Sequence, residues 1–179
     1  MRNFFVSAVL LLFCLPTSAV DGFNQPGFDY ANFEADSVLV CRNSCAGESK
    51  CLAWTWVKPG IQGPRGHCWL KSRIPKLVKD NCCNSGTGEG ILARDLKPEG
   101  NTNRPGSDYQ NFENATWQTC QSACTNDQKC VAWTQVRAGV QGPKGHCWLK
   151  SKAPYPVADP NTVSGVKLRP RVVLFDTND

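Results

Sequence analysis

The sequence has only two histidines and no C-x-x-C pair, although it contains eleven cysteines. Structural zinc sites use closely spaced cysteine and histidine ligands, so we expect no metal. Positive and negative charges are interspersed without long runs of one sign, which is not typical of a protein that binds nucleic acid. No G-x-S-x-G elbow or metal motif accompanies the histidines. Because no set of nucleophile, base and orienting group can be proposed, we expect neither catalysis nor a cofactor.

Long hydrophobic runs are also missing, with one exception at the start, MRNFFVSAVLLLFCLPTSAV. Arg2 precedes an apolar stretch that Pro16 ends, and three small residues follow. We interpret residues 1–19 as a secretory signal peptide that is cut after Ala19. The stretch is too short to span a bilayer comfortably, and no other segment is apolar enough. We therefore expect a secreted protein, extracellular or, in a bacterium, periplasmic, without a transmembrane segment in the mature chain.

Export changes the meaning of the cysteines. Cys14 is lost with the signal peptide, and ten cysteines remain. An even number of cysteines in an oxidising compartment predicts a disulfide framework. Arg2 is lost too, so 19 lysines and arginines face 15 acidic residues and the net charge is +4, which indicates a mildly basic surface.

The heptapeptide GHCWLKS occurs twice, at residues 66–72 and 145–151. A shift of 79 residues places 26–86 over 105–165 without a gap, and 31 of these 61 positions are identical. The chain therefore contains two copies of one module, not a solenoid of many short units. We predict a first domain over residues 20–95, a Pro-, Gly- and Asn-rich linker over 96–106, and a second domain with a C-terminal tail over 107–179.

Each copy has the pattern of a short helix followed by two strands. Ser37 and Thr116 stand where an N-cap hydroxyl belongs, and each precedes a helix with two cysteines on one stripe. The segments CLAWTWV and HCWLK predict two strands of a hairpin, joined by the Gly/Pro loop 58–66. The fold class is therefore predicted to be α+β, with two small modules that each pack an antiparallel sheet on one helix.

Units of this size commonly need covalent cross-links. A short turn could join Cys45 to Cys51, and Cys41 would then reach Cys68 on the return strand. Four cysteines allow three pairings, however, and the sequence alone does not choose among them.

A helix with C-x3-C, then C-x-A-W-T, then C-W-L-K and a final S-G resembles the PAN/apple domain family. The resemblance covers essentially all of the mature chain. It implies a small antiparallel sheet that cradles one helix, and the bridges Cys41–Cys68 and Cys45–Cys51. The second copy offers the corresponding bridges Cys120–Cys147 and Cys124–Cys130. Apple domains add a third bridge between the domain ends, but no cysteine precedes either helix here, so the chain is closer to the shorter PAN type.

Cys82 and Cys83 have no counterpart in the second copy, where Asn161 and Thr162 stand. They could be free thiols, form bridges to another chain or bond to each other. Free adjacent thiols do not persist in an oxidising compartment. The neighbouring residues KDNCCNSG are turn formers. We therefore predict that these two cysteines form a bridge with each other in a surface turn.

Strand alternation divides the aromatic residues between two faces of the sheet. Trp54 and Trp69 are large rings that we expect to be covered by the D-Y-x-N-F segment. Trp56 is a better binding candidate, because the second copy has Gln135 in its place. The loops after the first strand are cationic in both copies. Our candidate ligand-binding residues are Trp56, Lys58, Gln62, Arg65, His67, Lys71, Arg137, Gln141, Lys144, His146 and Lys150.

The family resemblance implies binding of proteins or carbohydrates outside the cytoplasm and no enzymatic activity. The expected function is therefore a secreted, non-enzymatic tandem binding protein with an extracellular protein or carbohydrate as its ligand. The first alternative is an accessory or inhibitory protein that binds a protease. The second alternative is a secreted hydrolase.

Overall fold

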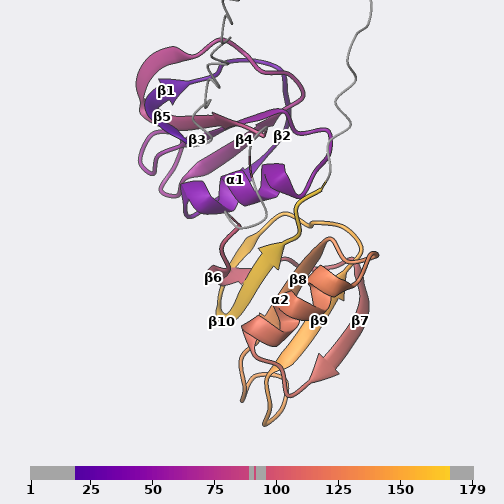
Figure 1. The fold of residues 1–179 in the computed structure, drawn as a ribbon. Coiled ribbons are helices and arrows are strands. Elements are labelled where there is room, and N and C mark those ends of the chain that lie inside the picture. Colours follow the sequence, from indigo (N-terminus) through magenta and orange to yellow (C-terminus); the bar gives the residue numbers. More distant parts are fainter. Residues whose placement is uncertain (1–18, 89–90, 92–95, 170–179) are drawn as a thin grey trace, which may run out of the picture.

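The structure, a computed structural model, describes residues 19–88, 91 and 96–169 (Figure 1). The predicted signal peptide lies outside these residues except for Ala19. The described chain forms two five-stranded antiparallel sheets, each with one helix, which confirms the predicted α+β class. We call the unit of β1–β5 and α1 the first module, and that of β6–β10 and α2 the second module.

The two modules have the same order of elements and the same sheet topology. In the first module the sheet order is β1-β5-β3-β4-β2, and in the second it is β6-β10-β8-β9-β7. The elements of the first module are β1 (Val20–Asn24), β2 (Asp29–Glu34), α1 (Val38–Ala46), β3 (Ala53–Val57), β4 (His67–Lys71) and β5 (Val78–Thr87). Those of the second are β6 (Glu99–Asn103), β7 (Asp108–Glu113), α2 (Trp117–Asn126), β8 (Ala132–Val136), β9 (His146–Lys150) and β10 (Val157–Val166).

The segment 96–106, predicted as a linker, includes strand β6 of the second sheet. β6 reads EGNTN and lacks β-branched or aromatic residues apart from one threonine, so its composition does not indicate a strand. Its extended form comes from pairing with β10, in which Gly100 lies opposite Val163 and Glu99 opposite Ser164. The second module therefore begins within the segment that composition suggested was a connection.

Both helices begin at the predicted hydroxyl caps. The Ser37 side chain accepts a hydrogen bond from the Val40 backbone N–H at 3.4 Å. Thr116 forms a reciprocal capping box with Thr119. The predicted hairpin is also present, because β3 pairs with β4 and β8 with β9.

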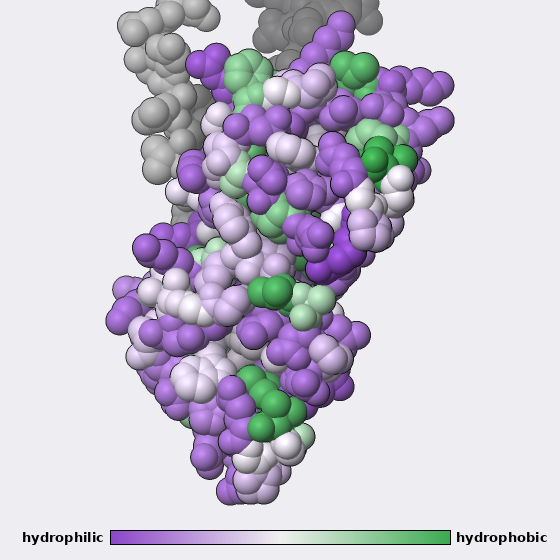
Figure 2. All heavy atoms as spheres, turned by 180° about the vertical axis from the view of Figure 1, so that it is seen from behind, coloured by the Kyte–Doolittle hydropathy of each residue, from purple (hydrophilic) through white to green (hydrophobic). Residues whose placement is uncertain are grey.

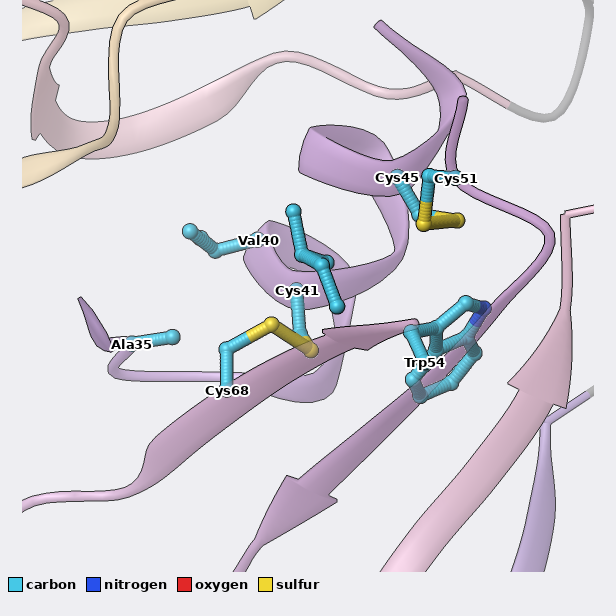
Figure 3. Close-up of a cluster of buried hydrophobic side chains, with 8 residues drawn as sticks. Ala35, Val40, Cys41, Cys45, Cys51, Trp54 and Cys68 are labelled. Carbon is cyan, nitrogen blue, oxygen red and sulfur yellow. A yellow bond between two sulfur atoms is a disulfide. The ribbon is translucent and has the colours of Figure 1, made fainter. Parts of the chain in front are cut away.

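The core of each module lies between the helix and one face of the sheet (Figure 3). Cys41 is bonded to Cys68 and Cys45 to Cys51, and the second module has the bridges Cys120–Cys147 and Cys124–Cys130. The pairing that the family resemblance implies is therefore present. Trp54 fills the space beside both bridges of the first module and is 1% exposed.

The Ser-Gly pair that ends each repeat is explained by contacts in this core. A side-chain carbon placed on Gly86 would lie 2.7 Å from the Trp54 ring, and one on Gly165 would lie 2.7 Å from the Trp133 ring. The preceding serine hydroxyls bond to threonines across the sheet, Ser85 to Thr55 and Ser164 to Thr134, each at 2.8 Å. Glycine is needed here because an indole ring packs directly on the backbone.

Cys82 and Cys83 are bonded to each other, as predicted, but they do not lie in a surface turn. Both belong to β5, where Cys83 pairs with Val57 of β3 and is fully buried. The turn-forming neighbours do not end the strand, because the Lys58 backbone N–H donates to the Cys82 carbonyl oxygen at 2.9 Å.

The two modules share a small apolar interface. Helix α1 lies on the side of the first module that faces the second (Figure 1). The buried cluster between them contains Ala46 of α1, Ile91, Leu96, Ala132 and Val166. A side-chain carbon on Gly47 would lie 2.9 Å from that of Ala153 in the second module, so the approach is close.

A buried arginine joins the modules at the same interface. The Arg104 guanidinium makes a two-pronged ion pair with Glu99, with both N–O distances 2.8 Å, and neither side chain is exposed. It also donates to the hydroxyl of Ser44 in α1 at 3.1 Å and to the Pro154 carbonyl oxygen at 2.7 Å. A buried ion pair that is fully hydrogen-bonded tolerates little displacement, so Arg104 holds α1 in place against the second module.

Candidate functional site

The face of each sheet turned away from its helix carries polar and aromatic side chains. Thr55 of β3 lies opposite Trp69 of β4, and directly paired residues project to the same face. Leu70 lies in the core beneath α1. His67 and Lys71 alternate with Leu70 and therefore share the outer face with Trp69, as strand alternation predicted.

Each outer face is hollowed at the same place. The first hollow, with a volume of about 230 Å³, is lined by Asn24, Pro26, Gly27, Asp29, Thr55, Val57, Gln62, Trp69 and Lys71. The second hollow, of about 240 Å³, is lined by Asn103, Pro105, Gly106, Asp108, Thr134, Val136, Gln141, Trp148 and Lys150. Every lining residue of the first hollow has its counterpart 79 positions later in the second.

All nine of these pairs are also identical in residue type. Over the repeat as a whole, only 31 of 61 positions are identical. The glycine and proline can be explained by the turn between β1 and β2. Backbone geometry does not require an identical Asn, Asp, Gln, Trp and Lys, so a shared chemical role is the simpler explanation.

A lysine–aspartate pair lies at one side of each hollow. The Lys71 ammonium donates to the Asp29 carboxylate and, at 3.4 Å, to the Gly27 carbonyl oxygen. The lysine side chain is 2% exposed, whereas the aspartate is 31% exposed. A buried ammonium needs such partners, and the carboxylate has further lone pairs that reach the hollow.

The second hollow repeats this pair with one electrostatic difference. Lys150 donates to Asp108 and to the Gly106 carbonyl oxygen. Burial lowers the pKa of Lys150, the Asp108 carboxylate acts in the opposite direction, and the nearby Arg104 lowers it further. Arg104 has no cationic counterpart in the first module, where Gln25 stands.

The indole ring at the other side of each hollow is held by a glutamine. Trp69 donates through Nε1 to Gln62 Oε1 at 3.0 Å, and Trp148 does the same to Gln141 at 2.9 Å. Because each amide oxygen faces the indole, each amide nitrogen is free to turn its N–H groups to the rim. The hollow thus offers a flat ring beside amide and carboxylate groups.

A histidine lies next to each of these rings. The ring centroids of His67 and Trp69 are 5.2 Å apart, and those of His146 and Trp148 are 4.9 Å apart. In both modules the histidine Nε2 lies 3.0 Å from an asparagine Oδ1, that of Asn32 or Asn111. The histidines therefore extend the aromatic surface outside the hollow.

The candidate residues from the sequence divide into three groups. Four of them, Gln62, Lys71, Gln141 and Lys150, line the hollows, and the two histidines lie beside them. The loop cations of the first module instead make ion pairs: Lys58 with Asp21 at 2.9 Å, and Arg65 with Glu34 and Asp36. Arg137 donates weakly to Asn101 at 3.4 Å, and Lys144 is exposed on its loop.

Trp56 is placed on the helix side of the sheet and not on the face of the hollows. It packs against the core, and its Nε1 donates to the Ala35 carbonyl oxygen at 2.8 Å. Gln135 makes the corresponding bond to the Ala115 carbonyl oxygen at 3.3 Å. The sequence difference between Trp56 and Gln135 suggested a binding role for Trp56. In the structure both side chains instead make the same kind of hydrogen bond to a backbone carbonyl oxygen.

The sequence reasoning did not select Trp69, Asp29, Asn24 or their counterparts. Trp69 was expected to be covered, yet it is only half-buried and lines the first hollow. These residues are identical in both copies, which could have indicated a shared role. Cysteines, glycines and core residues are identical as well, however. Only the fold distinguishes the residues of the hollows from those of the core.

Among the described residues, one group could bring metal-ligand atoms together: Asp80, Cys82 and Cys83. The two sulfur atoms are bonded to each other, and a disulfide sulfur is not the thiolate that binds metals. The Asp80 carboxylate itself accepts from the Cys82 backbone N–H at 3.1 Å. The group therefore supplies no metal site while the bridge is closed.

The fold and its bridges define the protein as a tandem of two small disulfide-bonded modules. A family model of the PAN domain matches residues 23–71 and 102–150. These two segments make up more than half of the chain, which therefore belongs to the PAN domain family.

Among solved structures, the chain is similar to the two N-terminal apple domains (residues 58–231) of Toxoplasma gondii microneme protein 4, determined in solution. The identity is 17% and the TM-score 0.33, over 83% of this chain and 88% of that chain. No curated protein matches the sequence. Within the described part of the chain, no helix has the length and apolar character to cross a membrane.

Proposed function

We propose that this protein is a secreted, non-enzymatic carbohydrate-binding protein with two equivalent sites, the first and second hollows. The observation that carries the proposal is the identity of all nine lining residues in two modules that differ at about half of their overlaid positions. Two copies of one site on one chain favour a ligand that is presented repeatedly, since linked sites increase avidity.

The chemistry of the hollows suits a sugar ring. Sugar hydroxyl groups need donors and acceptors close together, and Asn24, Asp29 and Gln62 supply both. An indole such as Trp69 offers an apolar surface for the C–H face of a sugar and keeps a polar edge. The hollows are smaller than the roughly 300–1,000 Å³ of pockets for drug-sized ligands, which favours one ring as the occupant.

A large protein partner is less well supported by the one face that Figure 2 shows. Figure 2 shows that hydrophobic residues on the face opposite to the view of Figure 1 form small, separate groups among polar ones. Docking surfaces for proteins are more often contiguous apolar patches. A protease-binding role remains an alternative that the experiment below separates from sugar binding.

Hydrolysis is disfavoured by the hydrogen bonds in the hollows. The hydroxyl that could act as a nucleophile, that of Thr55, is bonded to Ser85 at 2.8 Å. The lysine of the hollow is bonded to Asp29 and Gly27. A nucleophilic hydroxyl group requires an adjacent base. Lys71 does not serve as a base for Thr55, because its ammonium group is directed to the Asp29 carboxylate.

The test is a glycan array followed by calorimetry with the sugar that binds best. We expect two equivalent sites per chain in the wild type and one in Trp69→Ala or Trp148→Ala. The double variant should lose binding. Trp56→Gln, which introduces the residue of the second module, should bind like the wild type.

Loss of binding in Trp56→Gln with normal binding in the double variant would overturn the assignment to the hollows. An array without any binding sugar, together with capture of a protease from the native exterior, would favour the protein-binding alternative. Recovery of the chain from culture medium without residues 1–19 would support secretion.

A further inference from the structure

A larger cavity lies between the two modules. Its volume is about 440 Å³, nearly twice that of either hollow. The end of α1 and the following loop, residues 47–50, line it from the first module. Residues 151–155 and Ser107 line it from the second module, and Arg169 closes one side. Neither module forms this cavity alone.

The walls of the cavity are held in fixed positions. The Ala46 carbonyl oxygen, at the end of α1, accepts from the Arg169 backbone N–H at 3.1 Å. Arg104 bonds α1 to the carbonyl oxygen of Pro154, which itself lines the cavity. A site between two bodies is useful for binding only if their arrangement persists, and these bonds support that persistence.

The lining carries an excess of positive charge. Lys50, Lys152 and Arg169 contribute three cations, against a single carboxylate, that of Glu48, which lies 4.0 Å from the Lys50 ammonium. Glu48 accepts a hydrogen bond from the hydroxyl of Tyr30 at 3.0 Å. Among the described residues, no carboxylate lies within ion-pair distance of Lys152 or Arg169. This differs from the hollows, where each lysine is neutralised by its own aspartate.

Hydroxyl groups and apolar side chains make up the rest of the lining. Ser49, Ser107, Ser151 and the phenol of Tyr155 supply the hydroxyl groups, and Val131, Ala153 and Pro154 supply the apolar surface. Tyr155 is anchored by stacking on Phe33 of the first module, with ring centroids 4.8 Å apart. Burial raises the pKa of Tyr155, and so do the charge of Glu48 and the hydrogen bond between the two side chains, so Glu48 holds the phenol in place.

We propose that the cavity between the modules binds an anionic saccharide unit that carries a sulfate or carboxylate group. Lys152 and Arg169 contact the anionic group, and the serine hydroxyls bond to the ring. This site goes beyond the two hollows and depends on the tandem arrangement. Each hollow has one lysine, which is paired with an aspartate, so we expect the hollows to take neutral sugars.

The repeat supplies matched controls for a test. Arg73 is the counterpart of Lys152 in the first module, and Lys129 of the second module is the counterpart of Lys50. Lys50 and Lys129 even make the same contact, with the ammonium 4.1 Å and 4.4 Å from the ring centroids of Tyr30 and Tyr109. Reversing the charge of either member changes the net charge equally, but only one member lines the cavity.

The experiment is calorimetric titration of the full chain with a sulfated disaccharide, a carboxylated one, a neutral one of the same linkage, and inorganic sulfate. We expect one site per chain for an anionic disaccharide, which inorganic sulfate fills only weakly and for which the neutral disaccharide does not compete. Lys152→Glu should weaken binding about tenfold or more, since it removes a hydrogen bond between charged groups and places a like charge beside the anion. Arg73→Glu should leave the affinity within about twofold, as expected for a charge outside the site.

Equal losses in the two members of a matched pair would show diffuse electrostatic attraction and overturn the site. Binding of sulfate as tightly as of the disaccharide would overturn the saccharide assignment. The double variant Trp69→Ala/Trp148→Ala should still bind the anionic disaccharide. Loss of that binding in the double variant would assign the anion to the hollows. Binding of a neutral sugar to the hollows is measured independently of binding of the anionic disaccharide. Either proposal can therefore fail while the other holds.

Discussion

Gln25 of the first module and Arg104 of the second occupy equivalent positions and bond to equivalent carbonyl groups. Gln25 donates to the Pro75 carbonyl oxygen at 3.0 Å, and Arg104 donates to that of Pro154 at 2.7 Å. Only the arginine is long enough to reach further, to Ser44 of the other module. The comparison shows that one substitution on a shared scaffold can turn an internal contact into a bond between modules.

The partner of Arg104 differs between the modules in the same way. Glu99 of β6 corresponds to Val20 of β1. The second module thus has a buried ion pair where the first has an apolar residue and an amide. The hollows, in contrast, have not diverged at all. The two modules differ where they meet each other and agree where we propose that they meet a ligand.

The strongest test of this comparison is Arg104→Gln, which gives the second module the residue of the first. Removal of one partner leaves the Glu99 carboxylate buried and unpaired, which costs about 3–5 kcal/mol. We expect a correspondingly lower free energy of unfolding in denaturant titrations.

The double variant Arg104→Gln/Glu99→Val installs both residues of the first module. Replacement of a complete buried pair is often close to neutral, so most of the lost stability should return. A double variant as unstable as Arg104→Gln would show that the bonds of Arg104 to Ser44 and Pro154 matter more than its pairing with Glu99.

The long bridge is expected to contribute equally in both modules. Cys41–Cys68 and Cys120–Cys147 both span 27 residues. Replacing either pair with alanines should cost about 3.5 kcal/mol by loop-closure entropy. Thermal unfolding of the two variants measures this directly. Clearly unequal losses would show that the interface stabilises one module more than the other.

A smaller effect is expected at the glycines beneath the core tryptophans. Gly86→Ala and Gly165→Ala each push a methyl group into an indole ring, and overpacking of this kind costs about 1–3 kcal/mol. Calorimetric unfolding should show similar losses for both. Gly100→Ala is a suitable control, because a methyl group there meets no atom within 4 Å.

The smallest effect concerns acid. Hydrogen bonds from Tyr109 and from the Lys129 backbone lower the pKa of Asp127 below 3.8. A carboxyl group whose pKa is lowered by folding contributes stability above its unfolded pKa and loses it as the pH falls through the folded value. The wild type should therefore exceed Asp127→Asn in stability at neutral pH, and the difference should shrink below about pH 4. A difference that is constant from pH 7 to pH 2 would contradict this.

Much of the module could be predicted because its signals are local or repeated. Ser37 and Thr116 cap their helices because a hydroxyl group at that position satisfies free backbone N–H groups. The hairpin follows from the composition of its strands. The bridge pairing came from the family resemblance, because spacing alone allowed three schemes.

Other features depend on partners that are distant in the chain. β6 is extended only because β10 pairs with it. Cys82 and Cys83 continue a strand although their neighbours favour a turn. The exposure of Trp69 depends on where the loops with Gly27 and Gln62 lie over the sheet, which no local pattern describes.

The amino-acid sequence by itself determined that two copies of a cysteine-bonded PAN module are present, since identity at a fixed shift and the order of the motifs are properties of the chain. Only the tertiary structure decided which identical residues share a hollow and which share a core. It also decided that the modules meet through Arg104 and together line an open cavity. The reason is physical: a binding site is a set of side chains that are close in space, and the pairing of β2 with β4 brings residues 29 and 71 together.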